Sequence, residues 1–334
     1  MRNSKPLTSG KLQRYVTICL CLVFLLALLP ACHPGPTVHF NRLERLIFGT
    51  PADQLQAELT RHQADYRTNL IRFQPSDPSY IAWLQGYVSD PTVRDIYRIT
   101  DSLLGDLSDE ERQLSRALGR AYRLCPEMPR LQHFYTMVTA DYDNYDHRVY
   151  TDGTDLCLAT DVYALPAMQR YAFFGLPAHV VRLCVPQQMV PDCMRQLAMQ
   201  HIAWPDHGAT LLDYAVAEGK VLYFVEKTMP HLHDTLLLRY SAPQLEWMRK
   251  NEKNVWGWLI QNQLLYNNDL SQFHNLLDYA PKTNAFGEGS APRTVAYIGW
   301  QIVKSYARRT NCTMQQLFDE VDSRRILSQS AWRP

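Results

Sequence analysis

The chain has 334 residues, and its 34 lysines and arginines nearly balance 33 aspartates and glutamates, for a formal charge of +1. This balance excludes the strongly basic surface on which nucleic-acid binding depends. With 46% hydrophobic and 11% aromatic residues, the composition is that of a folded protein with a sizeable core, not of a disordered stalk.

The first 31 residues have the pattern of a secretory signal peptide. Four basic residues precede an apolar run over residues 18–31, and the first acidic residue of the chain is Glu44. A membrane-spanning helix needs about 20 apolar residues, so this shorter run suits a cleavable signal. Its removal would leave 30 basic against 33 acidic residues in the mature chain.

The signal ends in Leu29-Pro30-Ala31-Cys32, which resembles a bacterial lipobox. In such lipoproteins the chain is cut before the cysteine, which carries acyl chains such as palmitate and becomes the new N-terminus. Each buried methylene contributes about 0.8 kcal/mol, so two or more acyl chains hold a protein stably at a membrane. Residues 32–36 are therefore predicted to be the lipidated N-terminus and a Pro/Gly spacer. The alternative is an ordinary signal peptide or a short anchor helix in which Cys32 is incidental.

The N-terminal half of the mature chain is predicted to be helical. Helix starts are indicated at Thr50-Pro51-Ala52-Asp53 and at Asp90-Pro91, where a capping side chain precedes a proline. Ser108 and Glu111 have the spacing of a capping box, followed by a helix to about Leu124.

The middle of the chain is β-prone. Residues 134–138 form a short strand-like run, and residues 148–160 have the pattern of a hairpin around Asp152-Gly153. An Asp-Gly pair suits a tight type I′ turn. We therefore expect a small antiparallel sheet in this region.

Helical periodicity returns in the C-terminal part of the chain. Capping boxes are predicted at Ser241 with Gln244 and at Thr313 with Gln316. The other expected helices cover residues 191–204, 210–226 and 291–309. The predicted fold class is therefore α+β and mainly helical, with residues 37–334 in a single domain.

Five cysteines follow Cys32, and their number is odd: Cys125, Cys157, Cys184, Cys193 and Cys312. At least one thiol is therefore free or paired with another chain. Cys184 and Cys193 are close enough in sequence for a loop-closing disulfide, but the pairing stays open. No CxxC pair occurs, which argues against a structural zinc site.

Several motifs recur in order through the C-terminal half: EGKVLYF at 218–224, LEW at 245–247, YIGWQIV at 297–303 and ILSQS at 326–330. Together with residues 161–177 they resemble the GldB family of gliding motility lipoproteins of Bacteroidetes. The resemblance implies a cell-envelope lipoprotein that works alongside the motility and type IX secretion machinery. Acidic residues after the lipidated cysteine accompany surface export in this phylum, and their absence here favours a periplasm-facing position.

The same layout also resembles zinc peptidases of the gluzincin kind, with HExxH on one helix and a Glu-Gly ligand on the next. Their chemistry needs two imidazoles at i and i+4, a glutamate base and a third ligand. Here the first helix has Leu197 and Ala198 before His201, and Glu218 stands at the third-ligand position. Leucine and alanine neither bind a metal nor move a proton. The resemblance thus implies a degenerate gluzincin-like scaffold, and we expect no catalytic residue, metal or cofactor.

Two other functions stay open. A zinc-dependent metallopeptidase with a rearranged site would use His201 and Glu218, with help from a neighbour such as Asp192. Otherwise His201 is a hydrogen-bonded core histidine, and Glu218 pairs with Arg293 or another cation. The second function is a lipoprotein that binds cell-wall glycans.

Four aromatic residues have helical spacing: Trp247, Trp256, Tyr297 and Trp300. They belong either to the core or to a cleft or docking surface lined by aromatic rings. The partners expected from the sequence and the resemblance are the membrane, through the acyl chains, and other envelope, motility or secretion proteins.

Overall fold

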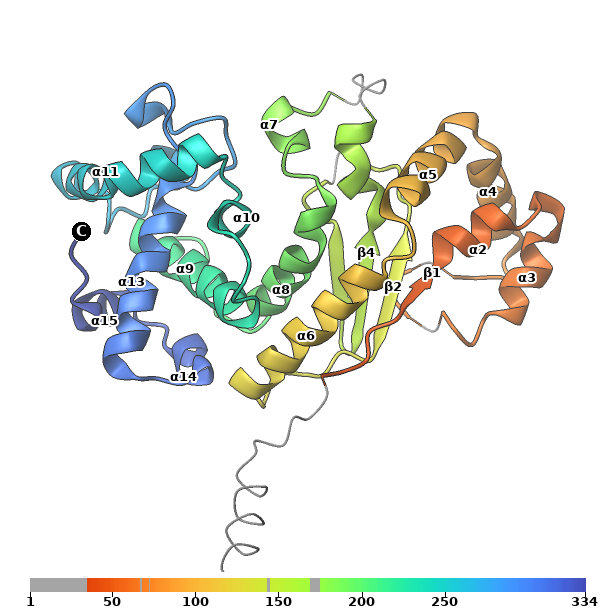
Figure 1. Ribbon diagram of the computed structural model, residues 1–334, viewed down its shortest axis with the longest axis horizontal. Helices are drawn as coiled ribbons and strands as arrows, with labels where there is room; N and C mark the ends of the chain where they lie inside the picture. The colour runs from red at the N-terminus through yellow and green to blue at the C-terminus, as the bar shows by residue number, and fades with distance from the viewer. Residues whose placement is uncertain (1–34, 67, 72, 143–144, 169–174) are drawn as a thin grey trace, which may run out of the picture. The chain divides into compact units, whose positions relative to one another are not determined.

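The computed structural model describes residues 35–334, except residues 67, 72, 143–144 and 169–174. The predicted signal peptide, Cys32 and the first residues of the spacer lie outside the described residues. The described chain is mainly helical and contains one small sheet, which confirms the α+β prediction (Figure 1). Within these residues, no helix combines the length and the apolar composition that a membrane crossing requires.

The sheet has the strand order β1-β2-β4-β3, with β1 at Phe40–Arg42, β2 at His133–Met137, β3 at Val149–Asp152 and β4 at Asp155–Ala159. β3 and β4 form the predicted antiparallel hairpin, and Gly153 takes the positive φ of +56° in its turn. β2 pairs with both β1 and β4 in parallel, so the prediction of an antiparallel sheet is wrong there. Parallel neighbours are joined by long crossovers, and no local turn signal marks them.

Both faces of the sheet are buried, each in its own hydrophobic core. In β4, Leu156 and Leu158 belong to the core that also includes α6, α8, α9 and α13. The alternating residues Cys157 and Ala159 belong to the core formed with α2 to α5. This alternation follows from the two-residue period of a strand.

Among the described residues, five α-helices precede β2: α2 (Leu43–Gly49), α3 (Leu55–Arg61), α4 (Pro78–Ser89), α5 (Pro91–Leu104) and α6 (Ser108–Leu124). Asp90 caps α5 as predicted, because its carboxylate accepts the amide hydrogens of the first turn. The helix expected after Thr50 begins instead as a 3-10 turn at Ala52–Gln54. The Thr50 hydroxyl donates back to the Leu46 carbonyl and therefore caps nothing ahead of it.

The capping box predicted for α6 does not form. Ser108 is already the first residue of the helix, and the N-cap residue Leu107 has no capping side chain. The Glu111 carboxylate instead accepts the amide hydrogen of Phe40 in β1 at 2.8 Å. A partner distant in sequence has thus replaced the local one.

Nine helices follow the sheet: α7 (Ala178–Val181), α8 (Met189–Met199), α9 (Leu211–Thr228), α10 (Asp234–Leu238), α11 (Ala242–Gln261), α12 (Leu270–Phe273), α13 (Thr294–Thr310), α14 (Met314–Asp319) and α15 (Ser323–Ser330), among the described residues. The capping boxes predicted at Ser241 and Thr313 are both present. α8 ends before the predicted limit at Trp204, which is exposed in the following loop.

All five cysteines of the described chain are free. The disulfide considered between Cys184 and Cys193 is therefore absent. Both thiols are buried, and Cys184 accepts a hydrogen bond from Arg148 at 3.8 Å. Burial raises the pKa of both thiols, which makes them poor nucleophiles.

Candidate functional site

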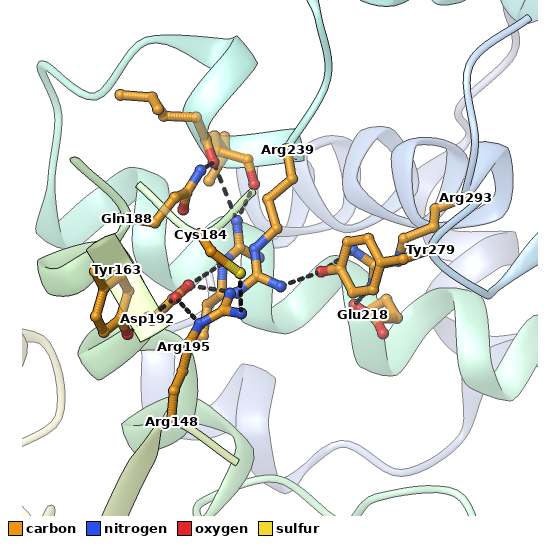
Figure 2. Close-up of polar contacts among 12 residues, drawn as sticks. Arg148, Tyr163, Cys184, Gln188, Asp192, Arg195, Glu218, Arg239, Tyr279 and Arg293 are labelled. Atoms are coloured by element: carbon orange, nitrogen blue, oxygen red, sulfur yellow. Dashed lines mark hydrogen bonds and ion pairs between the residues drawn. The ribbon is translucent and has the colours of Figure 1, made fainter. Parts of the chain in front are cut away.

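A buried group of charged side chains connects the sheet to the C-terminal helices (Figure 2). It contains four arginines, two carboxylates and one tyrosine, and we call it the arginine network: Arg148, Asp192, Arg195, Glu218, Arg239, Tyr279 and Arg293. Its members come from the segment before β3, from α8 and α9, from the residue after α10, from the loop that follows α12 and from the residue before α13. These segments are far apart in sequence.

Asp192 is the centre of one half of the network. It lies in the first turn of α8, and only 4% of its side chain is exposed. Its Oδ2 atom is 2.6 Å from Arg148 Nε, its Oδ1 atom pairs with Arg239, and the Tyr163 hydroxyl donates to it at 3.2 Å. Burial alone would raise the pKa of Asp192, but the surrounding arginines lower it to about 2. The carboxylate is therefore held in its charged form.

Glu218 is the carboxylate of the other half. It projects from α9, and its Oε2 atom is 2.7 Å from Arg293 Nη2. Arg293 is the N-cap residue of α13, and its Nε atom also donates to the Leu277 carbonyl at 3.0 Å. Of the open alternatives for Glu218, the structure therefore shows the pairing with Arg293.

Tyr279 joins the two halves. Its hydroxyl oxygen accepts hydrogen bonds from Arg239 and from Arg293, each at 2.7 Å. Burial would raise the pKa of this phenol, but the adjacent guanidinium groups outweigh burial and lower it. A continuous polar path therefore leads from Asp192 through Tyr279 to Glu218.

The network contains more positive than negative charge, since four guanidinium groups face two carboxylates. The excess of positive charge disfavours the charged form of Arg195. Burial and repulsion from Arg239 lower the pKa of its guanidinium to about 10. Its Nη2 atom donates to the Leu237 carbonyl, while its Nε atom is buried without a hydrogen-bond partner. The network therefore fixes the C-terminal end of α10 against α8.

The structure does not bring His201 and Glu218 together. His201 lies beyond the end of α8, partly exposed, and its Nδ1 atom is 2.7 Å from the Leu197 carbonyl oxygen. Among the described residues, no hydrogen bond or ion pair joins His201 to Glu218, whose carboxylate pairs with Arg293 instead. Leu197 and Ala198, at the positions of the missing zinc ligand and base, are buried in the core.

The four aromatic residues lie on α11 and α13. Tyr297 and Trp300 are buried and pack edge to face with ring centroids 5.9 Å apart. The indole nitrogen of Trp300 donates to Glu226 at 2.9 Å. Trp247 and Trp256 are partly exposed and pack against the same core. Two of the four are therefore core residues, and a docking role for the others stays a prediction.

Sequence reasoning did not find the arginine network as a unit. One signal was available, because Asp192 and Arg195 stand three residues apart in the otherwise apolar segment MVPDCMRQLAM. Charged residues in a buried helix need partners, which the sequence does not identify. In the part of the chain that the structure describes, no group of three or more His, Cys, Asp or Glu residues could hold a metal ion.

Comparison with known proteins gives one match. A family model described as gliding motility protein GldB matches residues 34–334. No characterised protein and no solved structure matches the chain in these comparisons. The family match covers all of the described residues, including every member of the arginine network.

Proposed function

Because the chain belongs to the GldB family of gliding motility lipoproteins, we propose that it is an accessory or scaffold of the gliding motility or type IX secretion machinery. In this proposal Cys32 carries the acyl chains, and the mature protein faces the periplasm. It acts by contact with other envelope proteins and catalyses no reaction.

The observation that supports a non-catalytic role is the pairing of Glu218. A zinc peptidase needs this carboxylate as a metal ligand. Here it forms an ion pair with Arg293, whose side chain is 6% exposed and also bonds Tyr279 and Leu277. A metal ion at Glu218 would have to displace this buried guanidinium, which would then lack its counter-charge.

Metal analysis of the purified full-length protein tests this part of the proposal. The protein is incubated with zinc, dialysed and measured beside a His201→Ala/Glu218→Gln variant. We expect no stoichiometric zinc in either protein and no peptide hydrolysis. One zinc per chain in the wild type, lost in the variant and accompanied by peptidase activity, would show that the protein is an enzyme.

Complementation of a deletion strain tests the lipoprotein role. Cys32→Ser is expected to abolish palmitate labelling, membrane retention and complementation, measured as gliding or as export of type IX cargo. His201→Ala is expected to complement like the wild type, because its ring bonds only a local backbone carbonyl. Membrane retention of an unlabelled Cys32→Ser protein would contradict the proposed anchor.

A further inference from the structure

The first described residues run along α6. Gly35 packs so closely on Gly119 that a Cβ on Gly119 would be 2.9 Å from the Gly35 Cα. The amide of Val38 then donates to the Ser115 hydroxyl at 3.1 Å. Because the later residue contacts the earlier turn of the helix, this segment is antiparallel to α6 and begins near its C-terminal half.

The chain between this contact and the proposed anchor is very short. Gly35 is the third residue after Cys32, and three residues span at most about 11 Å. If Cys32 is acylated, the membrane surface is therefore within about this distance of Gly35, and the neighbouring part of α6 faces it.

Next to the Gly35 contact, α6 carries three arginines on one face. Arg116, Arg120 and Arg123 recur at i, i+4 and i+7, and we call them the arginine stripe. Arg123 borders the contact, because its Nη1 atom would be 3.8 Å from a Cβ on Gly119. Arg116 and Arg123 are exposed, while Arg120 is partly exposed and its Nη1 atom donates to the Thr228 carbonyl at 3.1 Å. Among the described residues, no carboxylate forms an ion pair with any of the three.

The stripe also borders a cavity of about 470 Å³ between α6 and the segments around α8 and α10. Arg116 and Arg120 line one side, and His231 and His233 are also part of the lining. The remaining lining is largely apolar and includes Met229, while Glu110 is its acidic member. Cationic and apolar groups side by side match a phospholipid, which has a phosphate directly above its acyl chains.

We propose that the arginine stripe and this cavity dock on an anionic phospholipid surface and thereby set the orientation of the tethered protein. The proposal rests on the acylation of Cys32 proposed above. Acyl chains alone hold a protein at the membrane but do not select the face it presents. Each arginine near an anionic surface favours contact by about fivefold, so three favour this face strongly.

One consequence concerns the face that stays available to partners. α7 and α11 lie at the upper edge of the view in Figure 1, away from the lower, C-terminal end of α6. With the C-terminal end of α6 at the membrane, we expect α7 and α11 to lie farther from it. The partly exposed Trp247 and Trp256 of α11 would then be accessible to another envelope protein.

Quenching by spin-labelled lipid tests the orientation. The full-length acylated protein is reconstituted in vesicles that contain phosphatidylglycerol and a lipid with a nitroxide headgroup. A fluorophore is attached either at Glu127→Cys, just beyond α6, or at Glu246→Cys on α11; both sites are exposed, and each change removes one acidic charge. Cys312→Ser removes the one thiol of the described residues that is not buried. We expect strong quenching at position 127 and little at position 246.

Variants that remove positive charge distinguish docking of the arginine stripe from tethering by the acyl chains. Glutamine at all three positions of the arginine stripe should abolish the difference between the two labels, while the protein still floats with the vesicles. The matched control, Arg249→Gln/Lys250→Gln/Lys253→Gln on α11, removes the same charge and should preserve the difference. Vesicles of phosphatidylcholine alone should abolish it for the labelled proteins whose arginine stripe is intact, so this comparison needs no change in the stripe.

The outcomes are distinguishable. Equal quenching of both labels in anionic vesicles, or selective quenching that persists without phosphatidylglycerol or without the arginine stripe, would overturn the docking proposal. If the protein with an intact arginine stripe floats with anionic vesicles but shows no quenching at position 127, the docking proposal is wrong. The stripe would then be free to bind another partner, such as an acidic protein. Failure to float at all would instead refute the acylation of Cys32.

Discussion

Gly219 of α9 and Gly299 of α13 face each other where the two helices cross. A Cβ on Gly219 would overlap the carbonyl group of Gly299, and a Cβ on Gly299 would overlap the Ala215 carbonyl. Neither glycine has a positive φ, so the requirement is for space and not for a special backbone conformation. This contact lets α13, which supplies Arg293, pack directly on α9, which supplies Glu218.

Gly299→Ala is therefore expected to destabilise the protein by about 3 kcal/mol, because backbone atoms cannot move aside as a side chain can. Gly257→Ala on α11 is the matched control, since a Cβ there meets nothing within 4 Å. It should stabilise the helix by about 0.5–1 kcal/mol. Urea unfolding measures both, and equal stability of the two variants would contradict the close contact.

Removal of the partner of Glu218 should also be costly. Arg293→Met leaves a largely buried carboxylate without its counter-charge, and we expect a loss of about 3 kcal/mol in the free energy of unfolding. The double variant Glu218→Gln/Arg293→Met removes both charges and should recover part of this loss. A double-mutant cycle measured by chemical denaturation would show no coupling if the pair did not form.

Acid stability should depend on Asp192. Its pKa of about 2 in the folded protein is below the ordinary value of 3.8, so the charged form is favoured by folding. The resulting stability is fully present above about pH 4 and is lost as the pH falls from 4 to 2. The loss should be on the order of 2 kcal/mol. Asp192→Asn should flatten the stability profile in this window, and an unchanged slope would count against the network.

Alkaline stability should depend on Lys220, which is buried on α9 and donates to the Glu320 carbonyl at 2.6 Å beyond the end of α14. Burial lowers its pKa from 10.5 to about 8. Between these values the unfolded chain binds more protons than the folded one, so this group makes stability rise with pH. The stability of Lys220→Met relative to the wild type should therefore fall between pH 8 and 10. If the difference in unfolding free energy between Lys220→Met and the wild type stayed constant over this pH range, the lowered pKa of Lys220 would be contradicted.

The sequence was most informative where a structural element depends on its near neighbours. Asp90 caps α5, Ser241 and Thr313 begin their helices with capping boxes, and Asp152-Gly153 turns the hairpin, all as predicted. Each of these signals operates within three or four residues. Glu111 has the same local pattern, but its carboxylate bonds β1 and not its own helix.

The candidate site was only partly accessible from the sequence. The family resemblance and the absence of ligands at Leu197 and Ala198 are visible in the chain, and Arg293 was one of the cations considered for Glu218. Tyr279 could not be foreseen, because nothing in its loop indicates that two guanidinium groups would converge on its hydroxyl. His201 and Glu218 were paired by analogy, and in the structure Glu218 pairs with Arg293 while the His201 ring bonds the Leu197 carbonyl.

By itself, the amino-acid sequence determined the family, the mainly helical character, most helix starts and the hairpin, because these depend on short-range capping, turn and periodicity signals. Only the tertiary structure decided that β1, β2 and β4 are parallel and that polar side chains from six segments of the chain form one network. Strand pairing and buried ion pairs join residues tens of positions apart, such as Phe40 with Phe134 and Glu218 with Arg293. Their partners are selected by packing and desolvation, which no local pattern records.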